Sequence, residues 1–263
     1  MCDQPTGRLD PRLFYDDLAE DYHLVYADWT GSMRRQATAL DRVIQDSLGA
    51  GPQRILDCTC GIGTQALGLA QLGHEVLGTD LSPRAIERAR SEAHRLGLRV
   101  RFEVADVRTL GEVVGGEFDV VLSADNSLPH LLSEMDLRRG VRGMLGRVRP
   151  GGLFLASTRD YDQILEEKPS STPVGVTGPE GERRIAFQLW DWLPDGRTYR
   201  LELFLLRESG EGWTVRSRRA RYRAVTREEL AGIVREEGGG AARWLMPAES
   251  RFFQPLLVAL KRA

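Results

Sequence analysis

The chain has 263 residues, which is more than one typical domain of ~150 residues and fewer than two. Its 41% hydrophobic and 28% charged residues exclude a disordered chain. The formal charge of −2 gives no global reason to expect nucleic acid, a membrane surface or a strongly acidic partner. We therefore expect one large globular domain with an insertion.

Segment composition bears on location and on metals. No apolar run reaches the ~20 residues of a membrane span, and residues 1–12 lack the apolar stretch of a signal peptide. We therefore expect a cytoplasmic protein that does not bind membranes. Three cysteines, Cys2, Cys58 and Cys60, are too few for a disulfide framework. With four histidines and no CxxC pair, we also expect no metal site.

The first 48 residues have helical periodicity, which predicts helices over 13–26 and 32–48, with Ser32 as the N-cap of the second. From residue 53, short apolar runs alternate with helical stretches. We predict helices over 64–73, 82–97 and 137–152, the last ending at a Pro-Gly-Gly stop, and strands over 54–59, 74–80, 100–106, 118–125 and 153–158. Such alternation is typical of an α/β fold, in which a doubly wound, mostly parallel sheet binds ligands at the carboxyl ends of its strands.

The pattern changes after residue 159. Three β-rich runs, 183–193, 197–207 and 213–224, are separated by turn sequences and read as an antiparallel meander. A helix over 226–238 and strands over 241–245 and 252–263 then return to the main sheet. We therefore expect an N-terminal helical cap (1–49), a ligand-binding domain (50–159 and 226–263) and an inserted antiparallel β lid over the substrate (160–225).

The most informative segment is the turn Cys60-Gly61-Ile62-Gly63, which follows a predicted strand, and Asp80, which ends the next strand. Glycines let a ligand approach the backbone where a strand turns into a helix, and an acid at the end of the next strand can accept both ribose hydroxyls. The pair predicts nucleoside binding. A purely structural turn is the alternative.

Two further acids bear on the kind of nucleoside. Residues 61–66 also satisfy a GxGxxA dinucleotide fingerprint, which is a weak signal alone. Asp57, at the end of the first strand, would repel a pyrophosphate but attract a cationic ligand. Asp106 follows the third strand, where it can accept a hydrogen bond from an adenine amine. The acids favour a cationic adenosyl ligand, and an NAD-dependent oxidoreductase stays as an alternative.

The run from Leu56 to Gly63, followed by Asp80 and Asp106, resembles the class I S-adenosylmethionine-dependent methyltransferases over residues 50–160, with a similar tail from 226. Thr59 stands where that family has its first glycine. The resemblance implies a seven-stranded Rossmann-like sheet and S-adenosylmethionine as cofactor, with S-adenosylhomocysteine as product. The cofactor-binding residues that it implies here are Asp57, Thr59, Cys60, Gly61, Gly63, Asp80, Leu81, Asp106 and Val107.

The run Asn126-Ser-Leu-Pro-His130-Leu resembles an element of the glycine N-methyltransferase-like enzymes, where it follows the fourth strand at the reactive end of the cofactor. The resemblance implies catalytic roles for Asn126 and His130. An alternative for His130 is a histidine satisfied within its loop. The further cofactor contacts that this resemblance implies are Ala124, Asp125 and, from the N-terminal segment, Tyr22, Trp29 and Gln36.

These features predict methyl transfer by in-line displacement to a small-molecule acceptor, most simply an amine of the glycine or sarcosine kind. Residues 183–224 hold ten arginines against five acids, a charge of +5 that leaves −7 for the remainder, and such a basic lid can steer a carboxylate acceptor. The arginines can equally form a solvated face. A nucleic-acid methyltransferase that stacks bases on Trp213 and Tyr222 and a non-catalytic adenosyl-binding module are further alternatives. The β-rich insertion offers strand edges through which two subunits can pair as a homodimer, and the sequence leaves the oligomeric state open.

Overall fold

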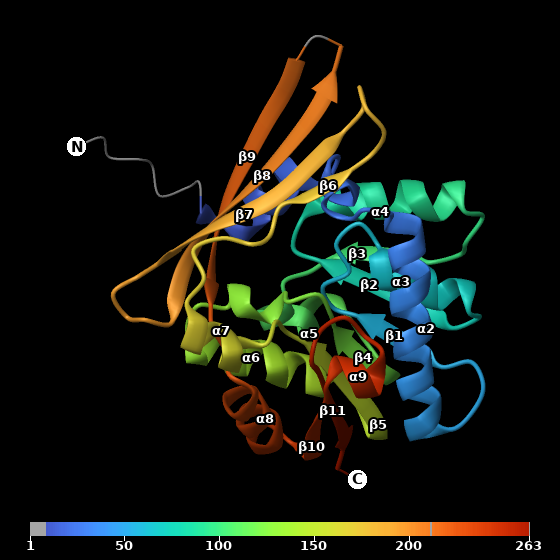
Figure 1. The fold of residues 1–263 in the computed structure, drawn as a ribbon. Helices are drawn as coiled ribbons and strands as arrows, with labels where there is room; N and C mark the ends of the chain where they lie inside the picture. The colour runs from blue at the N-terminus through green and yellow to red at the C-terminus, as the bar shows by residue number, and fades with distance from the viewer. Residues whose placement is uncertain (1–8, 211, 263) are drawn as a thin grey trace.

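The main sheet has seven strands, which confirms the predicted fold class. The computed structural model describes residues 9–210 and 212–262. The strand order is β10-β11-β5-β4-β1-β2-β3, and all pairs are parallel except those of β11 with β5 and β10 (Figure 1). The strands are β1 (Arg54–Asp57), β2 (Glu75–Asp80), β3 (Arg101–Val104), β4 (Phe118–Ser123), β5 (Val148–Ser157), β10 (Gly239–Leu245) and β11 (Leu256–Lys261).

Helices cover both faces of this sheet because alternate strand residues are apolar on opposite sides. Ile55 packs with α2 (Trp29–Leu48), α3 (Thr64–Gln71) and α4 (Pro83–Arg95), whereas its neighbour Leu56 packs with α5 (Leu110–Val113), α6 (Glu134–Leu145) and α8 (Arg227–Glu236). The order reverses between β4 and β1, as in other doubly wound sheets, so the carboxyl ends of these two strands border a crevice.

Two predicted boundaries are wrong for identifiable reasons. The expected helix over 137–152 ends at Leu145, and the Pro-Gly-Gly run lies inside β5, because Val148 already pairs with Phe118 of β4. The last strand begins at Leu256 rather than residue 252, directly after Pro255, which has no N–H to donate to a ladder.

The N-terminal segment differs from its prediction in both helices. Helix α1 (Pro11–Leu18) is followed by a separate short helix, η2 (Tyr22–Val25), rather than running to residue 26. Helix α2 begins at Trp29, not after Ser32, because the Asp28 carboxylate caps it by accepting from the Gly31 N–H at 2.9 Å. The break before η2 allows the Asp21 carboxylate to accept from Arg216 of the inserted sheet at 2.7 Å.

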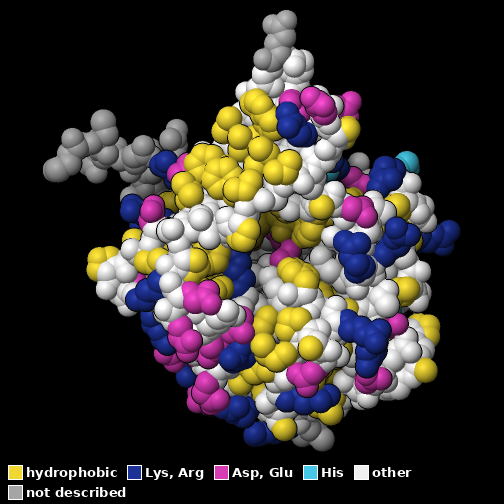
Figure 2. All heavy atoms as spheres, viewed as in Figure 1, with side chains coloured by type: hydrophobic (Ala, Val, Ile, Leu, Met, Phe, Trp, Pro, Cys, Tyr) yellow, Lys and Arg dark blue, Asp and Glu magenta, His cyan; other side chains and the backbone are white. Residues whose placement is uncertain are grey.

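The antiparallel meander is confirmed as a separate four-stranded sheet in the order β6-β7-β8-β9. Its strands are β6 (Gly175–Thr177), β7 (Arg184–Trp192), β8 (Thr198–Ser209) and β9 (Gly212–Arg223). Strand β6 and helix α7 (Tyr161–Glu167) were not predicted. One face of this sheet packs against α1 and α7 through Tyr199 and Leu201. The other exposes apolar side chains, among them Val176, Leu189 and Val215, as the upper part of Figure 2 shows.

Candidate active site

The glycine turn lies between β1 and α3, where the sequence predicts it. Gly61 and Gly63 have φ angles of 53° and 94°, in the left-handed region that favours glycine. A Cβ added at Gly63 would lie 2.9 Å from the Leu67 side chain, whereas one added at Gly61 would meet nothing within 4 Å. Packing against α3 therefore requires glycine at position 63, and the face of the turn at Gly61 is open to a ligand.

Asp80 is attached to this turn by hydrogen bonds. Its Oδ2 accepts from the Gly61 N–H and its Oδ1 from the Ser82 N–H, both at 2.9 Å. Burial raises the pKa of Asp80 to about 6, and these N–H groups oppose the rise. The carboxylate is thus held at the end of β2, beside the open face of the glycine turn.

Asp57 is placed differently from its prediction as a ligand-contacting acid. Its side chain has no exposed surface, its Oδ2 has no hydrogen-bond partner, and it does not line a cavity with the other predicted residues. Burial raises its pKa to about 7, so the group is only partly ionised at neutral pH. Asp57 lies beneath the turn, where its charge can act on a ligand only through the intervening backbone.

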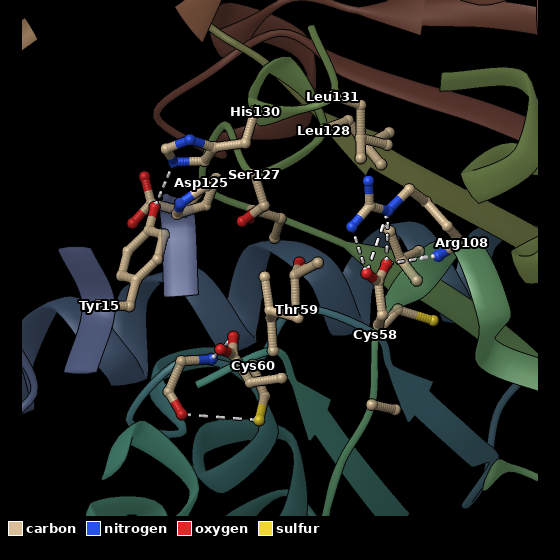
Figure 3. Close-up of a pocket in the computed structure, with 18 of the residues that line it drawn as sticks. Tyr15, Cys58, Thr59, Cys60, Arg108, Asp125, Ser127, Leu128, His130 and Leu131 are labelled. Atoms are coloured by element: carbon tan, nitrogen blue, oxygen red, sulfur yellow. Dashed lines mark hydrogen bonds and ion pairs between the residues drawn. The ribbon is translucent and has the colours of Figure 1, made fainter. Parts of the chain in front are cut away.

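Most predicted cofactor residues meet around a first cavity of about 290 Å³ (Figure 3). It also holds unpredicted residues, notably Tyr15, Arg108 and Arg221. The predicted residues that line it are Tyr22, Thr59, Cys60, Gly61, Asp80, Leu81, Asp106, Val107, Ala124, Asp125 and His130. The sequence motifs thus converge on one hollow at the carboxyl ends of β1, β2 and β4.

Asp106 is not free to receive an adenine amine without competition, because Arg108 donates to both its oxygens (Figure 3). Burial alone would raise the pKa of Asp106, but the hydrogen bonds from Arg108 hold it below its ordinary value. The carboxylate therefore stays ionised and can accept a further donor from a ligand in the cavity.

A second cavity of about 490 Å³ adjoins the first, and Tyr15, Tyr22 and Asp125 line both. Its walls come from distant parts of the chain: α1, η2, α2, the loop after β4, the inserted sheet and the loop before β11. Gln36 and Asn126 lie here rather than in the first cavity. Figure 2 shows the molecule hollowed between the inserted sheet and the main domain.

The loop after β4 has unusual backbone geometry. Asp125 and Asn126 have φ angles of 58° and 64°, which non-glycine residues rarely adopt. The Asp125 N–H donates to the Ser157 Oγ at 2.8 Å, and the Asn126 Oδ1 accepts from the Arg159 N–H at 3.1 Å. Asn126 is 3% exposed and its Nδ2 has no partner. Such strain is found where a site dictates side-chain position, and here it directs both residues into the second cavity.

Arg159 was not predicted as a site residue, yet its guanidinium lies in the wall of the second cavity. It donates to the Tyr199 hydroxyl and to the Gln188 Oε1, both at 3.0 Å, and lies 4.8 Å from the centre of the Trp190 ring. Within residues 9–210 and 212–262, no carboxylate lies within 4.0 Å of this guanidinium. No local sequence motif marks Arg159 as a site residue. Its only sequence signal is its position directly before Asp160, the N-cap of α7.

His130 faces the first cavity and is enclosed by aromatic rings. Its Nε2 is hydrogen-bonded to the Tyr15 hydroxyl at 2.9 Å, as Figure 3 shows, and its ring centre lies 4.0 Å from that of Tyr222. Burial lowers the pKa of His130 to about 3, so the imidazole is neutral at pH 7. In this setting His130 positions Tyr15 rather than accepting a proton from a ligand in the second cavity.

Two further predicted residues lie outside the cavities. Trp29 is buried in the core, where its Nε1 donates to the Thr64 Oγ1 at 2.9 Å. Gly63 lies on the side of the turn that packs against α3. Gln36, in the second cavity, accepts a hydrogen bond at 2.6 Å from Gln65, in the first, and so connects the walls of the two cavities. Among residues 9–210 and 212–262, no helix is long and apolar enough to cross a membrane. The same part of the chain contains no group of three or more His, Cys, Asp or Glu side chains that could hold a metal ion.

Comparisons with known proteins agree with this geometry. Residues 55–152 match a family described as "Methyltransferase domain". A glycine/sarcosine N-methyltransferase of Halorhodospira halochloris is 28% identical over 188 residues, 69% of each chain. A ubiquinone biosynthesis O-methyltransferase of Cereibacter sphaeroides is 31% identical over 160 residues, 61% of this chain and 58% of that enzyme.

Solved structures extend the likeness to nearly the whole chain. A sugar N-methyltransferase from Streptoalloteichus covers 100% of this chain and 99% of its own, with a TM-score of 0.77 and 20% identity. An amino pentose methyltransferase from Micromonospora echinaspora, solved with S-adenosylmethionine bound, covers 92% and 95%, with a TM-score of 0.73 and 21% identity. At these identities the likeness shows a shared fold.

The fold and the glycine turn with Asp80 define a nucleoside-dependent α/β enzyme. Residues 55–152 form a methyltransferase domain, and the chain as a whole is similar to S-adenosylmethionine-dependent methyltransferases. The first cavity fits that cofactor, since the open face over Gly61 admits a ligand, Asp80 can accept ribose hydroxyls, and the acids suit a cationic ligand. This assignment favours methyl transfer over the NAD-dependent alternative.

Proposed function

We propose that this enzyme transfers the methyl group of S-adenosylmethionine to the amine of a small acceptor that also carries a carboxylate. The observation that carries the proposal is Arg159, whose guanidinium faces the second cavity without an ionic partner among the described residues. A buried cation is costly unless it is paired, and a carboxylate is its best-matched partner. The second cavity is therefore the acceptor cavity.

Asn126 supports the same assignment. Asn126 lines the acceptor cavity, and its Nδ2 is buried near the Tyr161 hydroxyl without a well-formed hydrogen bond. Such an orphaned donor costs ~1–3 kcal/mol unless a ligand satisfies it. The Asn126 Oδ1 accepts from the Arg159 backbone N–H, so the two residues are held side by side in the wall of the acceptor cavity.

The point of transfer is the boundary between the cavities, where Tyr15, Tyr22 and Asp125 line both. When bound, the cofactor supplies an electrophilic methyl group on a sulfonium. The residues of this chain contribute position and exclusion of water: Arg159 and Asn126 fix the acceptor's carboxylate, and α1 and η2 close the outer wall over its amine. Orienting two reactants in this way accounts for a large share of catalysis in displacement reactions.

The inserted sheet supports its proposed role as a substrate lid. It contributes Gln188, Leu203 and Tyr222 to the acceptor cavity, and we propose that residues 160–225 act as this lid, with 50–159 and 226–263 as the cofactor domain and 1–49 as the cap. Its arginines engage the chain itself: Arg216 donates to Asp21, and Arg218 donates to the Asp17 carbonyl at 3.2 Å. They therefore give little support to a nucleic-acid surface.

The proposal is tested by measuring S-adenosylhomocysteine release with matched acceptors. Glycine and sarcosine carry a carboxylate, whereas glycinamide keeps the amine and loses the charge. We expect turnover of the first two with a KM at least tenfold lower than that of glycinamide. Equal KM values, or turnover of amino sugars or RNA alone, would contradict the assignment of the acceptor's carboxylate.

A further inference from the structure

Asp125 is the only acidic residue among those that line the acceptor cavity in the described chain. Its Oδ2 accepts from the Tyr26 hydroxyl at 2.7 Å, and its Oδ1 has a long contact of 3.4 Å from the Gln254 Nε2. A hydrogen bond from the Tyr22 hydroxyl also lowers the pKa of this carboxylate. No cation lies within ion-pair distance of it in residues 9–210 and 212–262. Asp125 Oδ1 is therefore the more weakly engaged oxygen of a carboxylate that lies at the boundary of the two cavities.

The reaction needs a proton acceptor on this side. An aliphatic amine is protonated at neutral pH and has no lone pair for displacement until that proton leaves. Tyr15 and Tyr22 share the boundary, but burial raises the pKa of both, so they keep their protons. His130 lines only the first cavity, and its Nε2 is engaged by Tyr15. These groups leave the proton to Asp125.

We propose that Asp125 is the general base of the reaction, an inference that rests on the proposed function. The ammonium N–H bond of the acceptor breaks and its proton passes to Asp125 Oδ1. The freed lone pair forms the new N–C bond as the C–S bond of the sulfonium breaks, which leaves a neutral thioether and a methylated ammonium. Asp125 returns its proton to solvent when the products leave.

The surroundings suit a carboxylate that acts as a base. Burial raises the pKa of Asp125, while the Tyr26 hydrogen bond and the charge of Arg159 oppose the rise. The titratable groups that face it are Tyr22 and Tyr26 from the segment around η2, Tyr15 from α1 and Arg159 after β5. A carboxylate whose pKa is raised by burial accepts a proton more readily than an exposed carboxylate.

The test is the pH dependence of kcat/KM in Asp125→Asn. The amide keeps an oxygen for the Tyr26 hydroxyl but cannot take a proton. At pH 7 we expect kcat/KM to fall by ~10²–10⁴-fold. The wild-type kcat/KM should rise through the pKa of Asp125 and then stay level as the pH approaches the pKa of the amine. In the variant, kcat/KM should instead rise tenfold per pH unit up to the pKa of the acceptor's amine.

Two further variants separate this role from a structural one. Asp46→Asn changes an exposed acid on α2 and should leave the profile unchanged. Tyr26→Phe removes the hydrogen bond that holds the pKa of Asp125 down, so its acid limb should move to higher pH. The proposal would be overturned if the pH profile of kcat/KM in Asp125→Asn had the same shape as in the wild type. It would also be overturned if the rise of kcat/KM at low pH occurred at the same pH in Tyr26→Phe as in the wild type. If the wild type methylates no amine, the proposed function itself fails.

Discussion

The two cavities of this enzyme share a wall but have opposite electrostatic character. The first is lined by five acids, Asp10, Asp80, Asp106, Asp125 and Asp136, against two arginines. The acceptor cavity is lined by three arginines, Arg35, Arg159 and Arg251, against Asp125 alone. If the acceptor carries a carboxylate, as we propose, the cationic cofactor is favoured in the first cavity and the acceptor in the second, so charge sets the order of the two ligands across the boundary.

The largest expected effect is on the first cavity alone. Asp80→Ala removes the acceptor for the ribose hydroxyls and for the Gly61 N–H. Hydrogen bonds to charged groups contribute ~1.5–3 kcal/mol each, so two of them correspond to a loss of S-adenosylmethionine affinity of at least ~100-fold. Isothermal titration measures it, with Asp46→Ala as the matched control. Unchanged affinity in Asp80→Ala would remove this residue from the site.

A smaller effect is expected on the acceptor cavity alone. Arg159→Met keeps a long apolar stem and removes the guanidinium. We expect the KM for glycine to rise by ~30–100-fold, because a charge-assisted pair is lost, while that for glycinamide stays within twofold. Cofactor affinity, measured by titration, should not change. A parallel rise for both acceptors would show that Arg159 acts by packing and would end the contrast between the cavities.

The smallest effect should reach both cavities. Arg216 forms an ion pair with Asp21, which lies between α1 and η2 and next to Tyr22 in the wall that the two cavities share. The pair is partly exposed, so Arg216→Ala should cost ~0.2–1 kcal/mol, equivalent to a rise of ~1.4-fold to fivefold in the KM values of both the cofactor and the acceptor. The difference from wild type should shrink in high salt. Arg200→Ala, on the exposed face of β8, is the control, and an effect confined to one substrate would show that the wall is not shared.

The predictability of the two cavities differs for the same reason that their walls differ. Gly61, Asp80 and Asp106 each lie at the end of a strand or shortly after one, within 46 residues of chain, so a local pattern is enough to bring them together. Arg159 and Tyr222 reach the acceptor cavity through strand pairing and sheet docking, which periodicity does not specify. Trp29 shows the converse limit, because a resemblance transfers a position without telling a core residue from one that lines a cavity.

At position 125, the residue that best suits the left-handed backbone differs from the residue that the proposed chemistry needs. Glycine adopts a φ of 58° without strain, so the backbone alone would select it there. Yet glycine would bring no carboxylate to the boundary between the cavities. An aspartate retained in such a conformation lowers the stability of the folded chain in exchange for a charge held where the two ligands meet. Selection for thermal robustness and selection for turnover would therefore favour different residues at position 125.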